Sequence, residues 1–427
     1  MARVAVIGAG IVGACCAFTL IRDGHTVVLI DPAEPGGPHA ASHGNGAWFS
    51  PASVVPMSVP GLWRQLPGML LSREGPVRLR AAALPGLAPW LLRFLRAGAT
   101  PERASAIAAA LGPLLRGCAA RHAQLAQDAG VPALVVRRGL LYAYPDREAF
   151  EREAFAWGLR RGQGVAWQVC EGEALRMLAP SLADAYRFGA HVPEGGHCTD
   201  PAAYVAALVA ASERSGAQRL RAAALRLRLH AGRLAAVQTT QGEVVCDAAV
   251  IAAGINAVDL ARQAGDRVPL AAERGYHAVF EMQGVALPVP VPVPVMPSDG
   301  RMANTPTRQG LRVAGQVEFA PPGAAPDWRR ADLLVRQARR LWPALAGDVA
   351  VSRWMGQRPS TPDGLPVLGR ASGCPDVLHA FGHGHVGMAA APASAQLMAD
   401  LLAGRTPGLD PGPYRAARFA RAHSPGL

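Results

Sequence analysis

Apolar and polar positions near the start of the chain follow a strand pattern, then a helix pattern, then a strand pattern again. Residues 3–7, RVAVI, form a short continuous apolar run, as in a strand that is buried on both faces of a parallel sheet. A mostly apolar stretch follows and stops at Gly24, which predicts a helix. Residues 26–30, TVVLI, predict a second buried strand that ends at Asp31. Together these segments predict a complete β-α-β unit.

The turn inside this unit reads GAGIVG and predicts a dinucleotide site. Gly8 permits a tight turn, Gly10 lets the backbone approach a pyrophosphate, and Gly13 lets the helix pack closely on the strand. The helix N-terminus presents unpaired N–H groups to the phosphates. Asp31, 18 residues beyond Gly13, can accept hydrogen bonds from an adenosine ribose, and it would repel a 2′-phosphate, which disfavours NADP.

The segment after Asp31 favours FAD over NAD. An NAD-binding domain would continue with alternating helices and strands, whereas residues 32–50 form a long polar, glycine-rich connection that resembles a loop laid along a ligand. Residues 59–98 and the stretches up to about residue 130 have a basic, amphipathic helical pattern. Such a face can rest on a membrane surface or pack against the rest of the protein.

Beyond residue 138 the hydrophobic period changes, and strand patterns alternate with helix patterns. Helices are predicted over 200–216 and 329–345, and a meander over 232–254. Further strands are predicted over 138–144, 187–192, 275–282, 301–306 and 311–319. Residues 286–297 alternate valine and proline, and because proline cannot donate a backbone hydrogen bond, we expect an exposed edge or polyproline-like segment there and not a central strand.

Composition excludes several classes of protein. A length of 427 residues suggests two domains. The net charge of +12 is spread along the chain without a basic block, so nucleic acid is not an expected partner. There is no lysine in the sequence, which excludes a Schiff-base enzyme and a Walker-type nucleotide site. The apolar run at the start continues into a folded unit, and we expect a cytoplasmic protein.

Residues 381–388, FGHGHVGM, place two histidines one residue apart in a glycine frame. The spacing alone fits a metal site, an acid-base pair or a cofactor loop. A metal would need a third and usually a fourth ligand. No other cluster of histidine and cysteine is visible, and the seven cysteines contain no C-x-x-C pair, so we expect no metal site.

Three separated segments resemble the D-amino-acid oxidase superfamily of flavoproteins, and within it the bacterial D-amino-acid dehydrogenases. They are the N-terminal unit, residues 244–254 (VVCDAAVIAAG) and the tail from 354 to 402, while residues 41–61 are similar to the flavin-side loop of those dehydrogenases. The resemblance implies an α/β fold, with a Rossmann-type FAD-binding domain and a second, mixed-sheet substrate domain.

The same resemblance implies a discontinuous domain arrangement. The FAD-binding domain would take residues 1–60, 198–265 and 350–427, and the substrate domain 61–197 and 266–349.

The resemblance also implies the cofactor site. In that family the segment matching 378–398 brings a helix N-terminus to the pyrimidine end of the flavin. We expect noncovalent FAD, because the position near Gly356 where some relatives attach flavin holds no cysteine; His39 or His43 is a less favoured anchor. The expected FAD-contacting residues are Gly8, Gly10, Ile11, Val12, Gly13, Asp31, Pro32, Ser42, Asn45, Gly46, Ala253, Gly254, Gly382, His383, Gly384, Val386, Gly387 and Met388.

Three residues are expected to act on the substrate. Arg358, in GQRPSTPDG, stands where related enzymes bind the substrate carboxylate, and a planar guanidinium suits bidentate binding. Tyr276 is a further candidate contact to the carboxylate or amine, and His385 or Tyr276 is expected to help deprotonate the amine.

The resemblance implies an FAD-dependent D-amino-acid dehydrogenase. Hydride would pass from Cα to flavin N5, and the imine would hydrolyse to a 2-oxo acid. Some oxidases of the superfamily activate oxygen with a lysine, so its absence favours electron transfer to a quinone or another carrier of the respiratory chain, with a peripheral contact to the inner face of the cell membrane as a further expectation. The alternatives are a dehydrogenase of D-proline or D-hydroxyproline and, from another class, a non-catalytic flavin-binding electron-transfer subunit.

Overall fold

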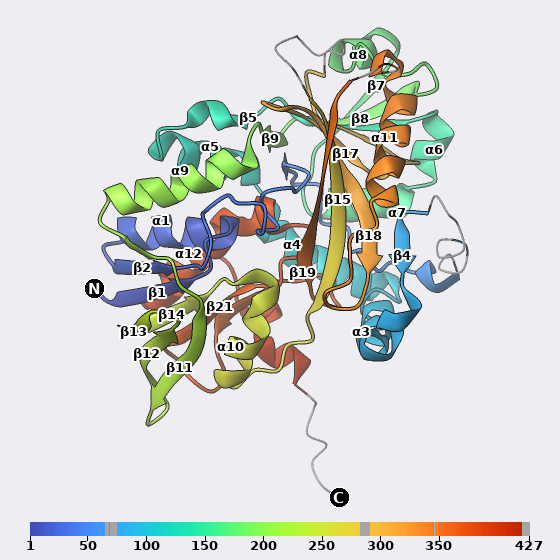
Figure 1. Cartoon of the computed structure of the whole chain (residues 1–427). Helices are drawn as coiled ribbons and strands as arrows, with labels where there is room; N and C mark the ends of the chain where they lie inside the picture. Colours follow the sequence, from blue (N-terminus) through green and yellow to red (C-terminus); the bar gives the residue numbers. More distant parts are fainter. Residues whose placement is uncertain (65–67, 69–74, 282–290, 346, 348, 421–427) are drawn as a thin grey trace, which may run out of the picture.

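Two large sheets organise the protein. The computed structural model describes residues 1–64, 68, 75–281, 291–345, 347 and 349–420. Within them a six-stranded and a nine-stranded sheet stand side by side, accompanied by two three-stranded sheets (Figure 1).

The six-stranded sheet contains the predicted β-α-β unit. Strand order is β10-β2-β1-β14-β21-β20, and every neighbouring pair is parallel except β20 with β21. Helix α1, Ile11–Arg22, connects β1 to β2, so the unit predicted from the apolar pattern is confirmed. The strands are β1 Arg3–Ile7, β2 Thr26–Ile30, β10 Gln218–Leu220, β14 Ala248–Ile251, β20 Val367–Arg370 and β21 Val377–Phe381.

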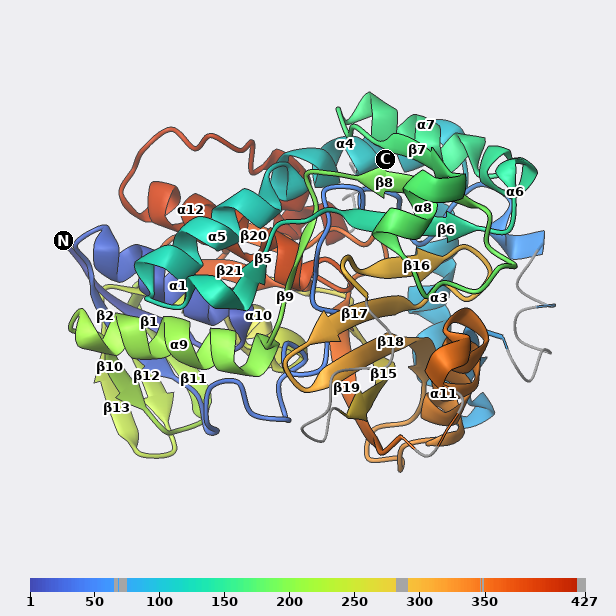
Figure 2. The same cartoon turned by 90° about the horizontal axis from the view of Figure 1, so that it is seen from above.

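Layers on both faces bury this sheet, which explains why β1 is apolar at successive positions. Val4 and Val6 of β1 pack with the helices on one face, and Ala5 and Ile7 pack with the meander and α10 on the other. The first layer contains α1, α5 Cys118–Asp128, α9 Pro201–Arg214 and α12 Gly387–Leu402 (Figures 1 and 2). The second layer contains β11 Ala224–His230, β12 Arg233–Thr239, β13 Gly242–Val245 and α10 Val258–Gln263.

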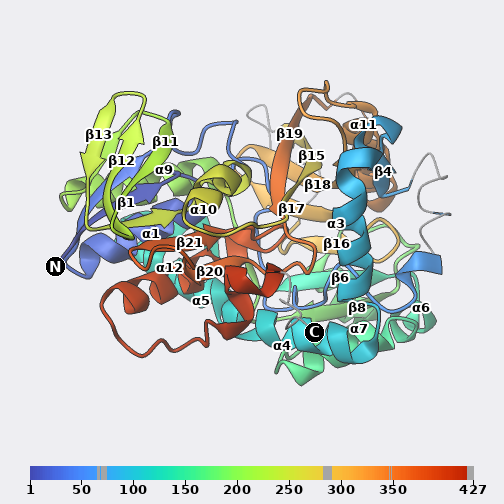
Figure 3. The ribbon, with the colours of Figure 1, turned by 90° about the horizontal axis from the view of Figure 1, so that it is seen from below.

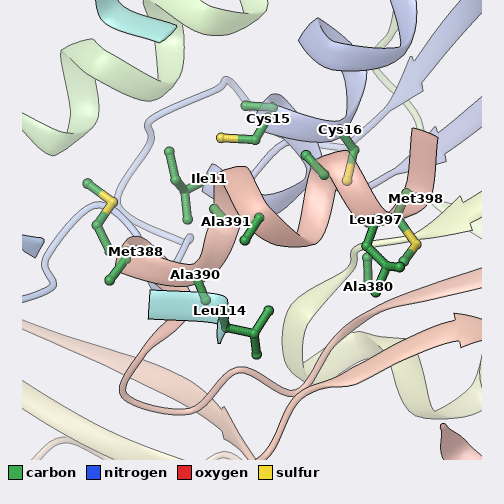
Figure 4. Close-up of a cluster of buried hydrophobic side chains, with 14 of the residues drawn as sticks. Ile11, Cys15, Cys16, Leu114, Ala380, Met388, Ala390, Ala391, Leu397 and Met398 are labelled. Carbon is green, nitrogen blue, oxygen red and sulfur yellow. The ribbon is translucent and has the colours of Figure 1, made fainter. Parts of the chain in front are cut away.

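Helices α1 and α12 pack directly against each other in the first layer (Figure 4). Ile11, Cys15 and Cys16 of α1 lie close to the small residues of α12, which include Ala390 and Ala391. Small side chains let the two helices approach closely, and this contact places their N-termini at the same end of the sheet.

The nine-stranded sheet is mixed, as the resemblance implied. Its order is β19-β15-β18-β17-β16-β6-β8-β7, with β4 beside β18. Helix α11, Arg329–Leu341, packs against β15 and β18. The strands are β4 Val77–Leu79, β6 Leu140–Tyr144, β7 Gln168–Glu171, β8 Phe188–Val192, β15 Ala271–Glu281, β16 Val295–Pro297, β17 Ala303–Thr307, β18 Gly310–Phe319 and β19 Val351–Ser360.

The remaining elements surround these sheets. A three-stranded sheet joins β3 Trp48–Phe49, β5 Val135–Val136 and β9 Gly196–Cys198. The other α-helices in the described part of the chain are α3 Leu84–Ala97, α4 Pro101–Leu115, α6 Arg147–Glu151, α7 Ala154–Gly162 and α8 Gly172–Leu178.

The valine-proline segment was predicted wrongly where the structure describes it. Residues 286–290 lie outside the described residues, but Val291, Val293 and Val295 are buried, and β16 runs between β17 and β6 inside the large sheet. Proline is tolerated because the segment pairs in parallel with β6 through its carbonyls, one of which, on Pro294, accepts the Leu141 N–H at 2.9 Å.

The basic, amphipathic stretch packs on the protein where it is described. Helix α3 lies beside the large sheet (Figure 3). Its Trp90 is buried against Ala271 of β15 and Phe319 of β18, and the Trp90 indole N–H donates to the Ser360 carbonyl at 3.1 Å. No helix in the described ranges is long and apolar enough to cross a bilayer.

Sheet membership bears on the predicted domain division. Strand β19 lies within the range 350–427 expected for the FAD-binding domain, yet it pairs with β15 along ten residues of the large sheet. We therefore propose a boundary after Ser360. Helix α5, which the prediction assigned to the substrate domain, packs on the six-stranded sheet, and the remaining predicted boundaries stay proposals.

Helix α12 contains a proline, and a side chain of another helix donates the hydrogen bond that this proline cannot donate. Pro392 cannot bond the Met388 carbonyl four residues earlier. His122 of α5 is fully buried, donates its Nε2–H to that carbonyl at 2.6 Å and accepts from the Tyr204 hydroxyl at 3.0 Å. His122 therefore fixes the first turn of α12.

Replacing His122 with phenylalanine should lower the unfolding free energy by about 1 to 3 kcal/mol, because a buried carbonyl then lacks a partner. Phenylalanine keeps the stacking on Phe49, whose ring centroid lies 4.0 Å from that of His122. Adding Pro392→Ala should recover part of the loss, since alanine supplies the missing N–H. Chemical denaturation measures the free energy of unfolding of the wild type and both variants. Equal values for His122→Phe with and without Pro392→Ala would show that the unpaired Met388 carbonyl does not cause the loss.

Candidate functional site

The glycine turn between β1 and α1 is tight on one side and open on the other. Gly8 has φ +107°, and a Cβ there would lie 2.5 Å from the Ala252 carbonyl oxygen at the end of β14. A Cβ on Gly13 would lie 1.8 Å from the Gly8 oxygen, so α1 lies directly against the strand. A Cβ on Gly10 would instead meet only the Ser42 hydroxyl, at 3.7 Å, among the described atoms.

Asp31, at the end of β2, holds the turn through its carboxylate. Its Oδ2 accepts the Ala9 N–H at 2.7 Å, and its Oδ1 accepts the Ala33 N–H at 2.9 Å, on the far side of Pro32. Ala253 and Gly254 follow β14 and border the same turn, with the Ala253 Cα 3.0 Å from the Cβ position of Gly8. Three of the segments predicted to bind the cofactor, the glycine turn and residues 31–32 and 253–254, thus meet at the ends of β1, β2 and β14.

The loop predicted to lie along the flavin is held by the large sheet. Arg312 of β18 donates to the carbonyls of His43 at 3.1 Å and Asn45 at 3.3 Å. His277 of β15 donates its Nδ1–H to the Gly44 carbonyl at 2.9 Å, and Thr305 of β17 donates to the Gly46 carbonyl at 2.7 Å. None of these three residues was predicted to hold the loop, because nothing in the local sequence pattern shows that their strands face it.

The segment between β21 and α12 turns through two glycines in left-handed conformations, Gly382 with φ +78° and Gly384 with φ +49°. The Gly384 N–H donates to the Pro359 carbonyl at 2.9 Å, which attaches the segment to the end of β19. His383 is buried and donates its Nε2–H to Ser394 of α12 at 3.0 Å. Burial lowers the pKa of His383 to about 3, so this histidine is a neutral core residue.

These features fit an FAD. The N-termini of α1 and α12 carry no side-chain cap, so their N–H groups are available to phosphate oxygens and to a pyrimidine that becomes anionic on reduction. The Ser42 hydroxyl is buried without a hydrogen-bond partner in the described residues, and it lies opposite the open side of Gly10. Ile11 and Val12 begin α1, and Val386, Gly387 and Met388 begin α12.

Arg358 of β19 is held on one side of its guanidinium. Its Nη1 donates to Glu273 Oε1 at 2.8 Å and to the Gln316 carbonyl at 3.0 Å. Gln316 lies at a β-bulge with φ +63°, which turns this carbonyl toward the arginine. A Cβ on Gly275 would lie 2.3 Å from Arg358 Cζ, so the group lies flat over a glycine. Its Nε and Nη2 have no hydrogen-bond partner among the described residues.

His385 lies beside this arginine. Its Nε2 is 2.6 Å from Glu273 Oε1, while Ser360 donates to Glu273 Oε2 at 3.1 Å. Burial raises the pKa of Glu273, but His385, Arg358 and Ser360 together outweigh burial and hold that pKa at about 2. Glu273 is therefore ionised, and it was missed because a glutamate within a strand gives no local signal.

Tyr276 is not brought together with Arg358 and His385. Side chains alternate along β15, so Tyr276 lies on the opposite face of the sheet from Glu273 and Gly275. It is buried, its hydroxyl donates to Glu318 and accepts the Asp327 N–H at 2.9 Å, and burial raises its pKa to about 12. Its surroundings are those of a core residue.

A glycine turn, two open helix N-termini and a polar cluster on the neighbouring sheet define a flavin-dependent oxidoreductase. The family model described as FAD dependent oxidoreductase (DAO) matches residues 3–401, and the chain belongs to this family. The resemblance inferred from the motifs, the fold class and FAD as cofactor are thereby confirmed.

Named relatives cover the whole length of the chain. A D-amino-acid oxidase of Bradyrhizobium diazoefficiens is 44% identical over 420 residues, covering 98% of this chain and 99% of the relative. D-amino acid dehydrogenase 2 of Ralstonia nicotianae is 32% identical, with coverage of 97% and 100%. Among solved structures, glycine oxidase from Geobacillus kaustophilus superposes with a TM-score of 0.70 at 23% identity, covering 98% and 99% of the two chains, which supports the fold.

The protein should purify yellow and release its FAD on heating or acid treatment. Position 356, where a cysteine anchor would stand, is a glycine covered by the Trp354 indole, whose Cη2 lies 1.9 Å from the Cβ position. Absorbance of the supernatant after denaturation measures released flavin against protein. Flavin that remains on the denatured chain would contradict this expectation, and peptide mapping would then examine His39 and His43.

Proposed function

We propose that the protein oxidises a D-amino acid at its Cα–N bond, and that the segments around the glycine turn, the 41–47 loop and the α12 N-terminus hold FAD. One observation carries this proposal: among the described residues, Nε and Nη2 of Arg358 have no hydrogen-bond partner, in a chain whose relatives are named a D-amino-acid oxidase and a D-amino acid dehydrogenase. These two donors form a planar fork that matches a carboxylate.

Arg358 and His385 have separate roles in the proposed reaction. Arg358 binds the α-carboxylate and thereby fixes the position of Cα. FAD, when bound, supplies the acceptor for the hydride that leaves Cα, and the resulting imine hydrolyses to a 2-oxo acid. His385, about one-third exposed and next to Arg358, takes up the proton of the substrate ammonium.

The electron acceptor is proposed to be a quinone or another carrier rather than oxygen. The chain has no lysine to activate oxygen over the flavin. The names of the relatives point both ways, since the 44% identical one is called an oxidase and the 32% identical one a dehydrogenase. A dehydrogenase role would fit a cytoplasmic protein with a peripheral contact to the inner membrane face.

The experiment compares reduction of an artificial dye or quinone with hydrogen peroxide formation. The panel contains D-alanine, D-proline, D-hydroxyproline and their L-isomers. We expect dye reduction by a D-isomer to be much faster than peroxide formation. Peroxide formed at a comparable rate would make the protein an oxidase, a clear preference for D-proline or D-hydroxyproline would favour the cyclic amines, and no turnover at all would favour an electron-transfer subunit.

A further inference from the structure

Glu273 joins three groups that come from different parts of the chain. It lies on β15 opposite Arg358 of β19 in the register of the two strands. His385 reaches it from the segment before α12, and Ser360 from the end of β19. With only 4% of its surface exposed, Glu273 is an ionised carboxylate enclosed by its partners.

This carboxylate determines which nitrogen of His385 carries a proton. A carboxylate accepts hydrogen bonds, so the Nε2 that lies 2.6 Å away must be protonated. In the neutral imidazole, Nδ1 is then the basic atom. No described residue bonds to it, and the His385 side chain is 32% exposed.

The same carboxylate also determines which donors of the Arg358 guanidinium stay available to a substrate. One of its nitrogens, Nη1, is occupied by Glu273 and the Gln316 carbonyl. The opposite edge of the guanidinium, Nε with Nη2, then remains available. Because Arg358 and His385 share the oxygen Oε1, a carboxylate on the arginine and an amine on the histidine would lie within one small substrate.

We propose that Glu273 is a positioning residue that couples carboxylate binding at Arg358 to proton uptake at His385, an inference that rests on the proposed function. In this step the proton leaves the substrate ammonium for His385 Nδ1, and the N–H electron pair stays on the substrate nitrogen. Glu273 stabilises the resulting imidazolium, while the charge of Arg358 opposes it. Among the charged groups that face His385, β15 contributes Glu273 and β19 contributes Arg358; His383 faces α12 instead.

The central test is Glu273→Gln, which keeps the shape and removes the charge. kcat/KM for the best D-amino acid should fall by about 100-fold near pH 7, within the usual range for proton-transfer groups. The kcat/KM of Glu273→Gln should recover at alkaline pH, where the substrate amine is already deprotonated. The part of the loss that comes from weaker carboxylate binding at Arg358 should remain. In His385→Asn, addition of Glu273→Gln should leave the pH-dependent part of the loss unchanged, because both act on one step.

Two measurements do not depend on turnover. Nitrogen NMR of histidine-labelled flavoprotein, with the His385 signals identified by their absence in His385→Asn, should show the neutral ring carrying its proton on Nε2 in the wild type and losing this preference in Glu273→Gln. Binding of a carboxylate that lacks an amine, followed by flavin absorbance, should weaken in Glu273→Gln. His230→Asn, an exposed position on β11, is the matched control and should change neither measurement.

The outcomes separate the two proposals. A wild type that oxidises no amino acid overturns the proposed function, whatever the NMR signals of His385 show. A wild type that does so while Glu273→Gln keeps the wild-type pH profile overturns the role of Glu273. If a variant loses FAD, the NMR signals of the apoprotein decide, and an unchanged His385 tautomer overturns the proposal equally.

Discussion

Arg358→Ala should lower kcat/KM for the best D-amino acid by roughly 30-fold to a few thousand-fold, because a charge-assisted pair with the substrate carboxylate is typically worth about 2 to 5 kcal/mol. FAD content should not change, since Arg358 lies on the large sheet and not at the glycine turn or the helix N-termini. Steady-state kinetics with a dye acceptor measure the effect. Arg358→Lys keeps the charge but loses the fork, and should recover only part of the activity.

The arginine also has a structural partner, so stability and activity must be separated. Removing Arg358 takes a cation from the buried Glu273, and the unfolding free energy should fall. In Arg358→Ala/Glu273→Gln no buried charge is left unpaired, so stability should return while kcat/KM stays low. Amines that lack a carboxylate should be poor substrates for the wild type and lose little more in Arg358→Ala.

Near-normal kcat/KM in Arg358→Ala with full FAD would place the carboxylate site elsewhere. Arg312 lies on the same face of the sheet, because it pairs with Val279 and the alternation places it with His277. It is bonded to the flavin-side loop and only 2% exposed, so it would need to release that loop to bind substrate. Arg353 is bound to Asp332 at 2.7 Å.

The second large effect is a steep loss of stability in mild acid. Burial lowers the pKa of His122, His277 and His383 to about 3, and that of His197 to about 4. These histidines are neutral in the folded protein and become protonated in the unfolded chain below its ordinary pKa of about 6.5. Stability is therefore fully present above pH 6.5 and is lost as the pH falls toward 3 to 4.

Each such histidine contributes a slope of about 1.4 kcal/mol per pH unit in the middle of that range, so the four together should give roughly 5 kcal/mol per unit near pH 5. Urea unfolding of the flavoprotein at intervals between pH 7.5 and 4.5 measures the slope. His122→Phe should reduce it by the share of one histidine, whereas His230→Asn, at an exposed position, should leave it unchanged. A stability that stays constant from pH 6.5 to 5 would show that these histidines are not held neutral.

The β-α-β unit was predictable because its determinants are close together in sequence. Continuous apolar runs, the glycine spacing and the acid at the end of β2 act within the first 31 residues, and the structure has each where the pattern predicts it. Strands of the large sheet could be predicted from period, since alternation needs only neighbouring residues, whereas the mixed pairing of the sheet was implied by the resemblance. The glycine frame of residues 381–388 was visible in the sequence, and the structure has Gly382 and Gly384 in left-handed conformations.

Which side chains and strands contact each other could not be predicted in the same way. His383 and His385 are two residues apart and chemically identical, yet one is enclosed by α12 and the other meets Glu273. The valine-proline segment looked unsuited to a central strand, but its carbonyls found a parallel partner in β6. Arg312 and His277 gave no signal, because their function is to hold a loop more than 200 positions away in the chain.

By itself, the sequence determined the dinucleotide turn, the order of strands and helices and the arginine motif, because each depends on local conformation and spacing. Only the tertiary structure decided that Glu273 contacts Arg358 across a strand pair and contacts His385, which is more than 100 positions away in the sequence. It also decided that Tyr276 lies on the opposite face of the sheet from these residues. The reason is physical: strand register sets which side chains share a face, and register is fixed by long-range pairing that leaves no trace in any short stretch of sequence.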